Sequence, residues 1–363
     1  YARGALQLGI LFAVLYGLVS LFGASRLIGF FKLNSPEVIA QAEWYVRIAC
    51  GLVIFSYLNA ILTGLLTAAG NSRTPFIVNV AGLVFNVVLD PVLIFGIGPF
   101  PELGVSGAAA ATVTAQALVS LLFFKAVLRE KVLFPHLRLW VLVPVKVWRE
   151  IVRIGVPSAV QNLIYAGISM ILTRLITGWG DLAVAAQRVG SQIESVSWMV
   201  GDGFSAAVNA FLGQNYGAKR YDRVRRGYFC AIAMTAAWGL CTTFLLIGMA
   251  RPLFSIFLQE EEVMAIGINY LRIVGLSQMF MMVEQTSIGA FSGLGRTLYP
   301  SIVSVTFTSA RIPVAVLLSS VMGLSGIWWA LSISSMVKGC ILFVSFVVFL
   351  YVFLERKKDE KTV

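Results

Sequence analysis

The chain has 363 residues, of which 58% are hydrophobic and 12% are charged, and its mean hydropathy is +0.86. This composition excludes an ordinary soluble domain and predicts a membrane protein. The net charge of +11 is compatible with a nucleic-acid partner, but the basic residues are distributed as in membrane proteins, so we expect no such partner.

Apolar runs of about 20 residues or more, the length that crosses a bilayer as a helix, recur along the whole chain. None of them alternates as the strands of a membrane barrel do, so they predict an all-α polytopic membrane protein. We expect ten spans, near residues 5–24, 46–68, 75–96, 105–124, 154–178, 182–212, 226–250, 264–292, 298–320 and 325–353.

The Lys and Arg residues outside these spans give an orientation. If Arg73 is placed in the cytoplasm, most of them lie on that side, including the run 125–153 and the cluster 219–226, whereas the acidic loop 260–262 faces outward. The positive-inside rule therefore predicts that both ends of this chain lie in the cytoplasm. We expect a multi-pass protein of the plasma membrane, with the prokaryotic cytoplasmic membrane as the first choice.

Two corners of similar layout, AAGNSRTP at 68–75 and GLGRTLYP at 293–300, indicate an internal repeat. An offset of 225 residues aligns seven identical residues, which are Tyr45, Arg47, Ile48, Phe55, Gly64, Gly70 and Pro75 with Tyr270, Arg272, Ile273, Phe280, Gly289, Gly295 and Pro300. Further on, GVSGAAAA at 104–111 matches GLSGIWWA at 323–330. Because an even number of spans separates the matched residues, the pattern predicts two parallel six-helix bundles.

The same offset predicts helices beyond this sequence. It places the first-half partners of spans 154–178 and 182–212 about 71 to 13 residues before Tyr1. We therefore expect the first two helices of the N-lobe, roughly 75 residues or more, to lie outside this sequence. The predicted domains are an N-lobe with four of its six helices at 1–128, a cytoplasmic linker with the single histidine, His136, at 129–149, a six-helix C-lobe at 150–356 and a cytoplasmic tail at 357–363.

Enzymatic signatures are missing from the sequence. It contains no G-x-x-x-x-G-K-[ST] loop, no set of residues suited to zinc or haem, and no nucleophile paired with a base. We therefore expect no catalytic residue, no metal and no cofactor. A duplicated polytopic chain of this kind predicts a secondary transporter or a flippase.

Ionisable residues inside spans are candidates for function, because they are costly in a bilayer. In NVVLDP at 86–91, Asn86 and Asp90 lie one helical turn apart, and Pro91 cannot donate a hydrogen bond to the carbonyl of Val87. This trio of oxygens suits a proton or a small cation. The alternative is a polar helix end held to the loop that follows, and spacing alone leaves both open.

In the second lobe, Glu284 lies near Met279, Met281 and Met282. Thioethers beside one carboxylate suit a cavity for bulky organic cations. The alternative is that the methionines belong to the core or face lipid and that Glu284 pairs with a neighbouring Arg. Arg311 occupies the position of Asn86 in the repeat, so we expect the ion site in the first lobe only.

Four motifs in this order resemble the multidrug and toxic compound extrusion (MATE) family: NVVLDPVLIFG at 86–96, GVSGAAAAT at 104–112, GQNYGA at 213–218 and GLGRT at 293–297. The resemblance implies a V-shaped pair of six-helix bundles that exports organic, often cationic, compounds in exchange for protons or sodium ions. It also implies a coupling site of Asn86, Asp90 and Thr112, together with an Asp on a first helix that lies outside this sequence.

The resemblance is closer to one branch of the family than to another. The sodium-coupled, Vibrio-type branch carries a Glu eight residues after its G-x-P motif, where this chain has Tyr165. This favours the branch named for DNA-damage-inducible protein F, in which proton coupling is usual. We expect a monomer in the lipid bilayer that moves small organic substrates through a cavity lined by Gln161, Tyr165, Met281 and Glu284, with H⁺ as the coupling ion and Na⁺ as the second option.

Two other transporter classes share features with this sequence. The major facilitator superfamily has the loop signature G-x-x-x-D-R-x-G-R-R, and GAKRYDRVRR at 217–226 has one residue too many before Asp222 and lacks the second Gly. A lipid-linked oligosaccharide flippase has a related fold and a similar composition. It stays open as the alternative function.

Overall fold

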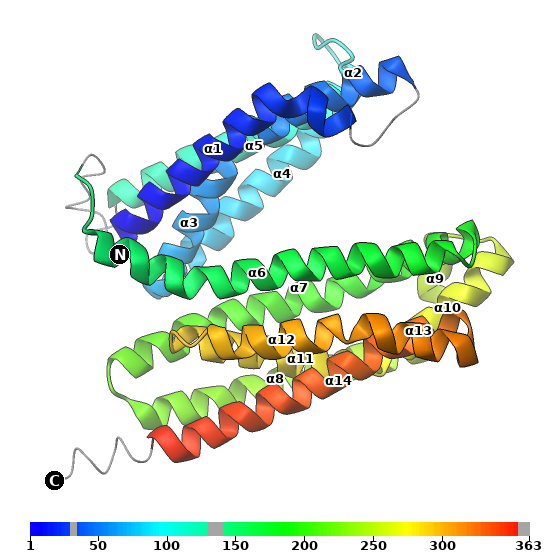
Figure 1. Cartoon of the computed structure of the whole chain (residues 1–363). Helices are drawn as coiled ribbons and strands as arrows, with labels where there is room; N and C mark the ends of the chain where they lie inside the picture. The colour runs from blue at the N-terminus through cyan, green and yellow to red at the C-terminus, as the bar shows by residue number, and fades with distance from the viewer. Residues whose placement is uncertain (30–34, 130–140, 355–363) are drawn as a thin grey trace. The chain divides into compact units, whose positions relative to one another are not determined.

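The computed structural model describes residues 1–29, 35–129 and 141–354 (Figure 1). All regular elements of these residues are helices, which confirms the all-α prediction for this part of the chain. Much of the linker expected at 129–149, including His136, lies outside the described residues, and so does the tail at 357–363.

The chain forms two compact units, Tyr1–Val152 (unit 1) and Arg153–Val363 (unit 2). Unit 1 contains α1 (Ala2–Gly29), α2 (Pro36–Tyr45), a π-helical segment (Val46–Cys50), α3 (Ile54–Ala68), α4 (Arg73–Phe95), α5 (Gly104–Arg129) and the start of α6 (Val145–Thr177). The rest of α6 belongs to unit 2. The other elements of unit 2 are α7 (Asp181–Gly217), α8 (Tyr221–Gly248), α9 (Ala250–Ser255), α10 (Glu261–Gly275), α11 (Gln278–Gly293), α12 (Leu298–Ser309), α13 (Arg311–Met322), α14 (Leu324–Phe349) and a π-helical segment (Leu350–Leu354).

In unit 1, α3, α4 and α5 pack around an apolar cluster and a polar one. Leu66, Val78, Val119 and Phe123 form the apolar cluster. The side chain of Asn59 is buried, donates to the backbone oxygen and side-chain oxygen of Gln116 at 2.9 and 2.7 Å, and accepts from Ser120 at 2.8 Å. Hydrogen bonds therefore join α3 to α5 where water is excluded.

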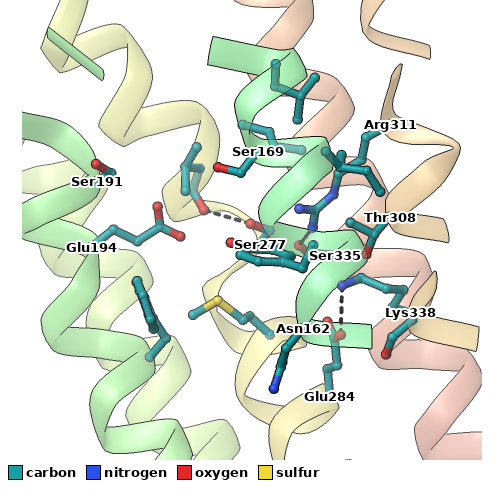
Figure 2. A pocket seen from close by; sticks show the side chains of 18 of the residues that line it. Asn162, Ser169, Ser191, Glu194, Ser277, Glu284, Thr308, Arg311, Ser335 and Lys338 are labelled. Atoms are coloured by element: carbon teal, nitrogen blue, oxygen red, sulfur yellow. Dashed lines mark hydrogen bonds and ion pairs between the residues drawn. The ribbon is translucent and has the colours of Figure 1, made fainter. Parts of the chain in front are cut away.

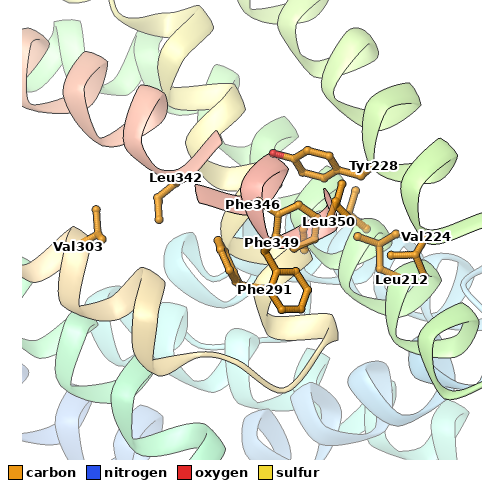
Figure 3. Close-up of a cluster of buried hydrophobic side chains, with 11 residues drawn as sticks. Leu212, Val224, Tyr228, Phe291, Val303, Leu342, Phe346, Phe349 and Leu350 are labelled. Carbon is orange, nitrogen blue, oxygen red and sulfur yellow. The ribbon is translucent and has the colours of Figure 1, made fainter. Parts of the chain in front are cut away.

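In unit 2, aromatic side chains from α8, α11 and α14 fill one core cluster (Figure 3). The ring centroid of Phe346 lies 4.3 Å from that of Tyr228 and 4.9 Å from that of Phe291, the latter edge to face. The hydroxyl of Tyr228 lies 2.9 Å from that of Ser287, so its polar end is satisfied inside the core.

The two matched corners have the same backbone. Gly70 and Gly295 both adopt positive φ, 90° and 69°. The amide after each glycine donates to a carbonyl five residues earlier, Asn71 to Leu66 and Arg296 to Phe291, both at 2.9 Å. This is the Schellman closure of a helix end, which requires the left-handed conformation that glycine adopts without strain.

The second matched motif also has one structure in both units. Gly104 and Gly323 have positive φ, 53° and 63°, at the start of α5 and α14. Three residues later, Gly107 and Gly326 lie so close to the backbones of Leu93 and Leu318 that a Cβ atom would overlap with them. Leu93 and Leu318 are themselves related by the 225-residue offset. Each unit thus depends on a glycine for the close approach of two helices.

Eight helices of the described residues are long and apolar enough to cross a membrane, with α2 to α3 and α12 to α13 each counted as one. The pair α10 and α11, bent by 50°, would be a ninth. The expected span at 182–212 corresponds to α7, which has 37 residues but carries Arg188, Glu194 and Asp202 and is not among the eight. The count of ten spans therefore stays a prediction.

Gly326→Ala should destabilise unit 2 by about 1–3 kcal/mol, because its Cβ would push α14 away from Leu318 of α13. Gly167→Ala on α6 is the matched control, since open space surrounds that position. Thermal unfolding of the purified protein should show a lower midpoint for Gly326→Ala only. Equal midpoints for the two variants would contradict the close contact.

Candidate functional site

Unit 2 contains a cavity of about 860 Å³, lined by residues of α6, α7 and α10 to α14 (Figure 2). Gln161 and Tyr165 of α6 and Met281 and Glu284 of α11, the residues expected around a substrate, all line it. Met282 is fully buried, against Gly201 and Gly239. Of the methionines near Glu284, only Met281 is among the lining residues. The structure thus places the four residues around one space, and their role in binding stays a prediction.

Glu284 forms a buried ion pair with Lys338 of α14. The Nζ atom of Lys338 lies 2.7 Å from Oε1 of Glu284, and the two side chains are only 7% and 8% exposed. The alternative prediction, that Glu284 pairs with a neighbouring Arg, is therefore wrong. A lysine 54 residues further along the chain reaches Glu284 because α11 and α14 pack together.

A break between α10 and α11 shapes the wall of the cavity. The Val274 carbonyl accepts from the hydroxyl of Ser277 at 2.9 Å, the Gly275 carbonyl from Thr243 at 2.8 Å, and the Ile273 carbonyl from Ser332 at 2.8 Å. In a bilayer a helix can break only where such partners replace the lost helical bonds. Hydroxyl side chains of α8, α14 and the break itself therefore stabilise the break.

The residues that flank this break hold Glu194 of α7. Tyr270 Oη donates to Oε2 of Glu194 at 2.9 Å, and Gln278 Nε2 donates to Oε1 at 3.1 Å. Two turns further along α7, Asp202 accepts from Gln285 of α11 at 3.0 Å. Two carboxylates thus lie on the α7 wall of the cavity. Their hydrogen-bond donors are the neutral side chains of a tyrosine and two glutamines.

Small residues allow α7 and α11 to approach so closely. A Cβ atom on Gly289 would overlap with the backbone of Ser205, and one on Gly293 would lie 2.5 Å from the carbonyl oxygen of Asn209. Close packing of glycine faces is how helices associate inside membranes. This contact brings Gln278 and Gln285 within reach of the α7 carboxylates.

The opposite wall is basic. Figure 2 shows Glu194 on one side of the cavity and Arg311, Thr308 and Lys338 on the other. Arg311 is 7% exposed; its Nε donates to the hydroxyl of Ser334 at 2.8 Å and its Nη2 to that of Ser335 at 3.0 Å. The repeat indicated that Arg311 takes the position of Asn86. No sequence pattern predicted that Arg311 or Lys338 lines the cavity. A single Lys within the very apolar run 325–353 is the signal that would have found Lys338.

In unit 1, Asn86 and Asp90 are half-buried on α4, and Nδ2 of Asn86 donates to Oδ1 of Asp90 at 3.2 Å. The helix continues past Pro91 to Phe95 and ends at Gly96, with φ of 67°. Thr112 is exposed on α5, and no hydrogen bond joins it to either residue in the described part of the chain. A cavity of about 360 Å³ in this unit lies elsewhere, between α3 and α4 near Thr63 and Asn79.

A family model described as MatE matches residues 1–92 and 157–317 of the chain. The chain is 31% identical over 317 residues to a "probable multidrug resistance protein NorM" of Thermotoga maritima, covering 83% of this chain and 66% of that protein. It is 27% identical over 328 residues to a "probable multidrug resistance protein YoeA" of Bacillus subtilis, covering 88% and 70%. The chain thus spans about two thirds of the length of these relatives.

The fold is shared with a solved structure of a MOP superfamily transporter from Pyrococcus furiosus. The TM-score is 0.88 at 21% sequence identity, covering 98% of this chain and 79% of that one. Identity this low shows the fold alone. The likeness covers nearly the whole chain, unit 1 as well as unit 2.

Removing either partner of the Glu284–Lys338 pair should destabilise the protein by about 3–5 kcal/mol, because the other charge stays buried without a counter-ion. Glu284→Gln and Lys338→Met should each lower the unfolding midpoint, whereas the double variant should recover most of the loss. Denaturation of all three against the wild type forms the double-mutant cycle. Additive losses in the double variant would show that the pair is not coupled.

Proposed function

Because the chain belongs to the MatE family, which is a family of transporters and not of enzymes, we propose that the protein is a secondary transporter that exports organic compounds, as a multidrug efflux pump does. The cavity of unit 2 is the proposed substrate site. The observation that carries this proposal is a large space inside a helix bundle with two carboxylates that form no ion pair in the described part of the chain.

The lining suits ring-shaped organic molecules. The volume of about 860 Å³ lies in the range of small-molecule sites. Tyr165, Trp198 and Met281 offer aromatic and thioether surface, and such surfaces attract organic cations through cation–π and dispersion contacts. Glu194 and Asp202 supply the negative charge that a cationic group requires.

Coupling to an ion gradient is assigned to Asp90. Its carboxylate accepts a hydrogen bond from Asn86 within an apolar helix, so protonation would remove a charge and change the hydrogen bonding of α4. Binding of the proton and of the substrate must then disfavour each other by about 1–3 kcal/mol for exchange to occur. We propose Thr112 of α5 as the third member of this site, to which no hydrogen bond joins it in the described part of the chain.

Sequence features support the proposed coupling ion, family branch and membrane orientation. Tyr165 in place of the sodium-branch Glu supports proton coupling and the branch named for DNA-damage-inducible protein F. The distribution of Lys and Arg supports a prokaryotic plasma membrane with the Arg73 corner and both ends of this chain in the cytoplasm. We propose a monomer as the working unit.

Asp90→Asn should abolish ion-driven efflux, because the amide cannot take up and release a proton. Ethidium efflux from vesicles that contain the full-length protein, under separately imposed proton and sodium gradients, measures this. The efflux rate of the variant should no longer depend on either gradient. Glu262→Gln, the same change at an exposed position of α10, is the control and should keep the wild-type rate.

The outcome also separates the two candidate functions. Efflux that survives in Asp90→Asn would remove the coupling role from Asp90 but keep the transporter. No efflux under either gradient, with the protein folded in the vesicles, would favour the lipid-linked oligosaccharide flippase.

A further inference from the structure

We propose that Arg311 is an anion-binding subsite of the unit 2 cavity, which holds a carboxylate or phosphate group of the transported molecule. This inference rests on the proposed function, because it takes the cavity as the substrate site. It adds a substrate class, organic molecules with an acidic group, to the cations that Glu194 and Asp202 suit.

The guanidinium of Arg311 is buried and incompletely satisfied. Its side chain is 7% exposed, and its only hydrogen bonds in the described part of the chain run to two neutral hydroxyls, from Nε to Ser334 and from Nη2 to Ser335. The remaining nitrogen, Nη1, has no partner among those residues. Since Arg311 lines the cavity, the edge formed by Nη1 and Nη2 is the part left for a ligand.

Every carboxylate around the cavity is engaged elsewhere. Glu284 pairs with Lys338 at 2.7 Å. Glu194 accepts from Tyr270 and Gln278, and Asp202 accepts from Gln285. Among the described residues, none of the three lies within ion-pair distance of Arg311, and the electrostatic attraction of Glu194 for Arg311 acts across the cavity without a direct contact. A buried cation without a direct ion-pair partner is costly, and an anionic ligand in contact with the guanidinium would offset that cost.

The internal repeat shows that the two units differ in charge at the position of Arg311. Asn86 and Asp90 of unit 1 correspond to Arg311 and Ala315 of unit 2 at the 225-residue offset. In unit 1 the carboxylate lies 3.2 Å from its partner one turn away. In unit 2 the residue one turn away is a fully buried alanine. Unit 2 thus has a cation at the position equivalent to Asn86 and no acid at the position equivalent to Asp90.

Other polar groups lie on the same face. Ser304 and Thr308 precede Arg311 by two turns and one turn, and both are buried residues that line the cavity. The hydroxyl oxygen of Ser304 has no hydrogen-bond partner in the described part of the chain. Together with Ser335 these hydroxyls form a small polar wall around the guanidinium.

The geometry of arginine selects the ligand. The planar guanidinium offers two parallel N–H groups to a carboxylate or phosphate, whereas an ammonium offers a point charge. A molecule with an acidic group at Arg311 and a cationic group toward Glu194 would satisfy both walls (Figure 2).

The test compares rhodamine B with its ethyl ester, which differ by one carboxylate. Binding of each dye to the full-length protein in detergent is measured by fluorescence polarisation. We expect the wild type to bind rhodamine B more tightly than the ester. Arg311→Gln should weaken rhodamine B about tenfold or more and leave the ester unchanged, because a charge-assisted hydrogen bond is lost.

Three further variants keep the result interpretable. Arg311→Lys retains the charge without the fork and should recover only part of the preference. Ala315→Asp supplies an internal carboxylate one turn from Arg311 and should weaken rhodamine B while Arg311 is intact. Arg174→Gln removes the same charge from an exposed position of α6 outside the cavity and should change neither dye.

The possible results separate the anion subsite from the substrate cavity. Equal binding of both dyes by the wild type, or equal loss of both in Arg311→Gln, refutes the anion subsite and leaves the substrate cavity in place. Loss of the preference in phosphatidylglycerol nanodiscs, with its retention in phosphatidylcholine, would assign Arg311 to a lipid headgroup and refute the subsite. Binding of neither dye refutes the cavity as a substrate site.

Discussion

The break between α10 and α11 is the constraint on which the unit 2 site depends. In a continuous helix, Tyr270 and Gln278 would lie about 12 Å apart along the axis, because each residue adds about 1.5 Å. The break brings both side chains to the carboxylate of Glu194. The break survives in an apolar setting because Thr243, Ser277 and Ser332 donate to the released carbonyls. These hydroxyls come from α8, the break itself and α14, so the site depends on the packing of α8 and α14 against the broken helix.

Charge in the cavity is arranged in two walls. The α7 wall carries Glu194 and Asp202, each held by neutral donors, and the α13 and α14 wall carries Arg311 and Lys338. Glu284 compensates only one of the two cations. Such a cavity combines attraction for a cationic group with an unsatisfied guanidinium, and this favours molecules that carry both kinds of charge.

The repeat explains why the two units share structure without sharing a site. The glycine corners at Gly70 and Gly295 and the close approaches at Gly107 and Gly326 are backbone requirements, and they recur. The side chains at positions 86 and 311 face no such requirement. One unit has an Asn one helical turn before an Asp, and the other has an Arg one turn before an Ala. Local backbone geometry is conserved between the units, whereas polar chemistry has diverged.

Much of this protein follows from the sequence by itself: the all-helical membrane class, the two corners and the presence of Glu284, Met281, Tyr165 and Gln161 around one cavity. These depend on hydropathy, glycine and proline chemistry, helical periodicity and motif order, all of which are local. Only the tertiary structure decided that Lys338 neutralises Glu284, that Gln278 and Tyr270 hold Glu194, and that Arg311 lies unpaired at the cavity. Those partners are 54 to 84 residues apart, and which helices bring them together depends on how the bundle packs, because a helical period says which face a residue occupies but not which helix that face meets.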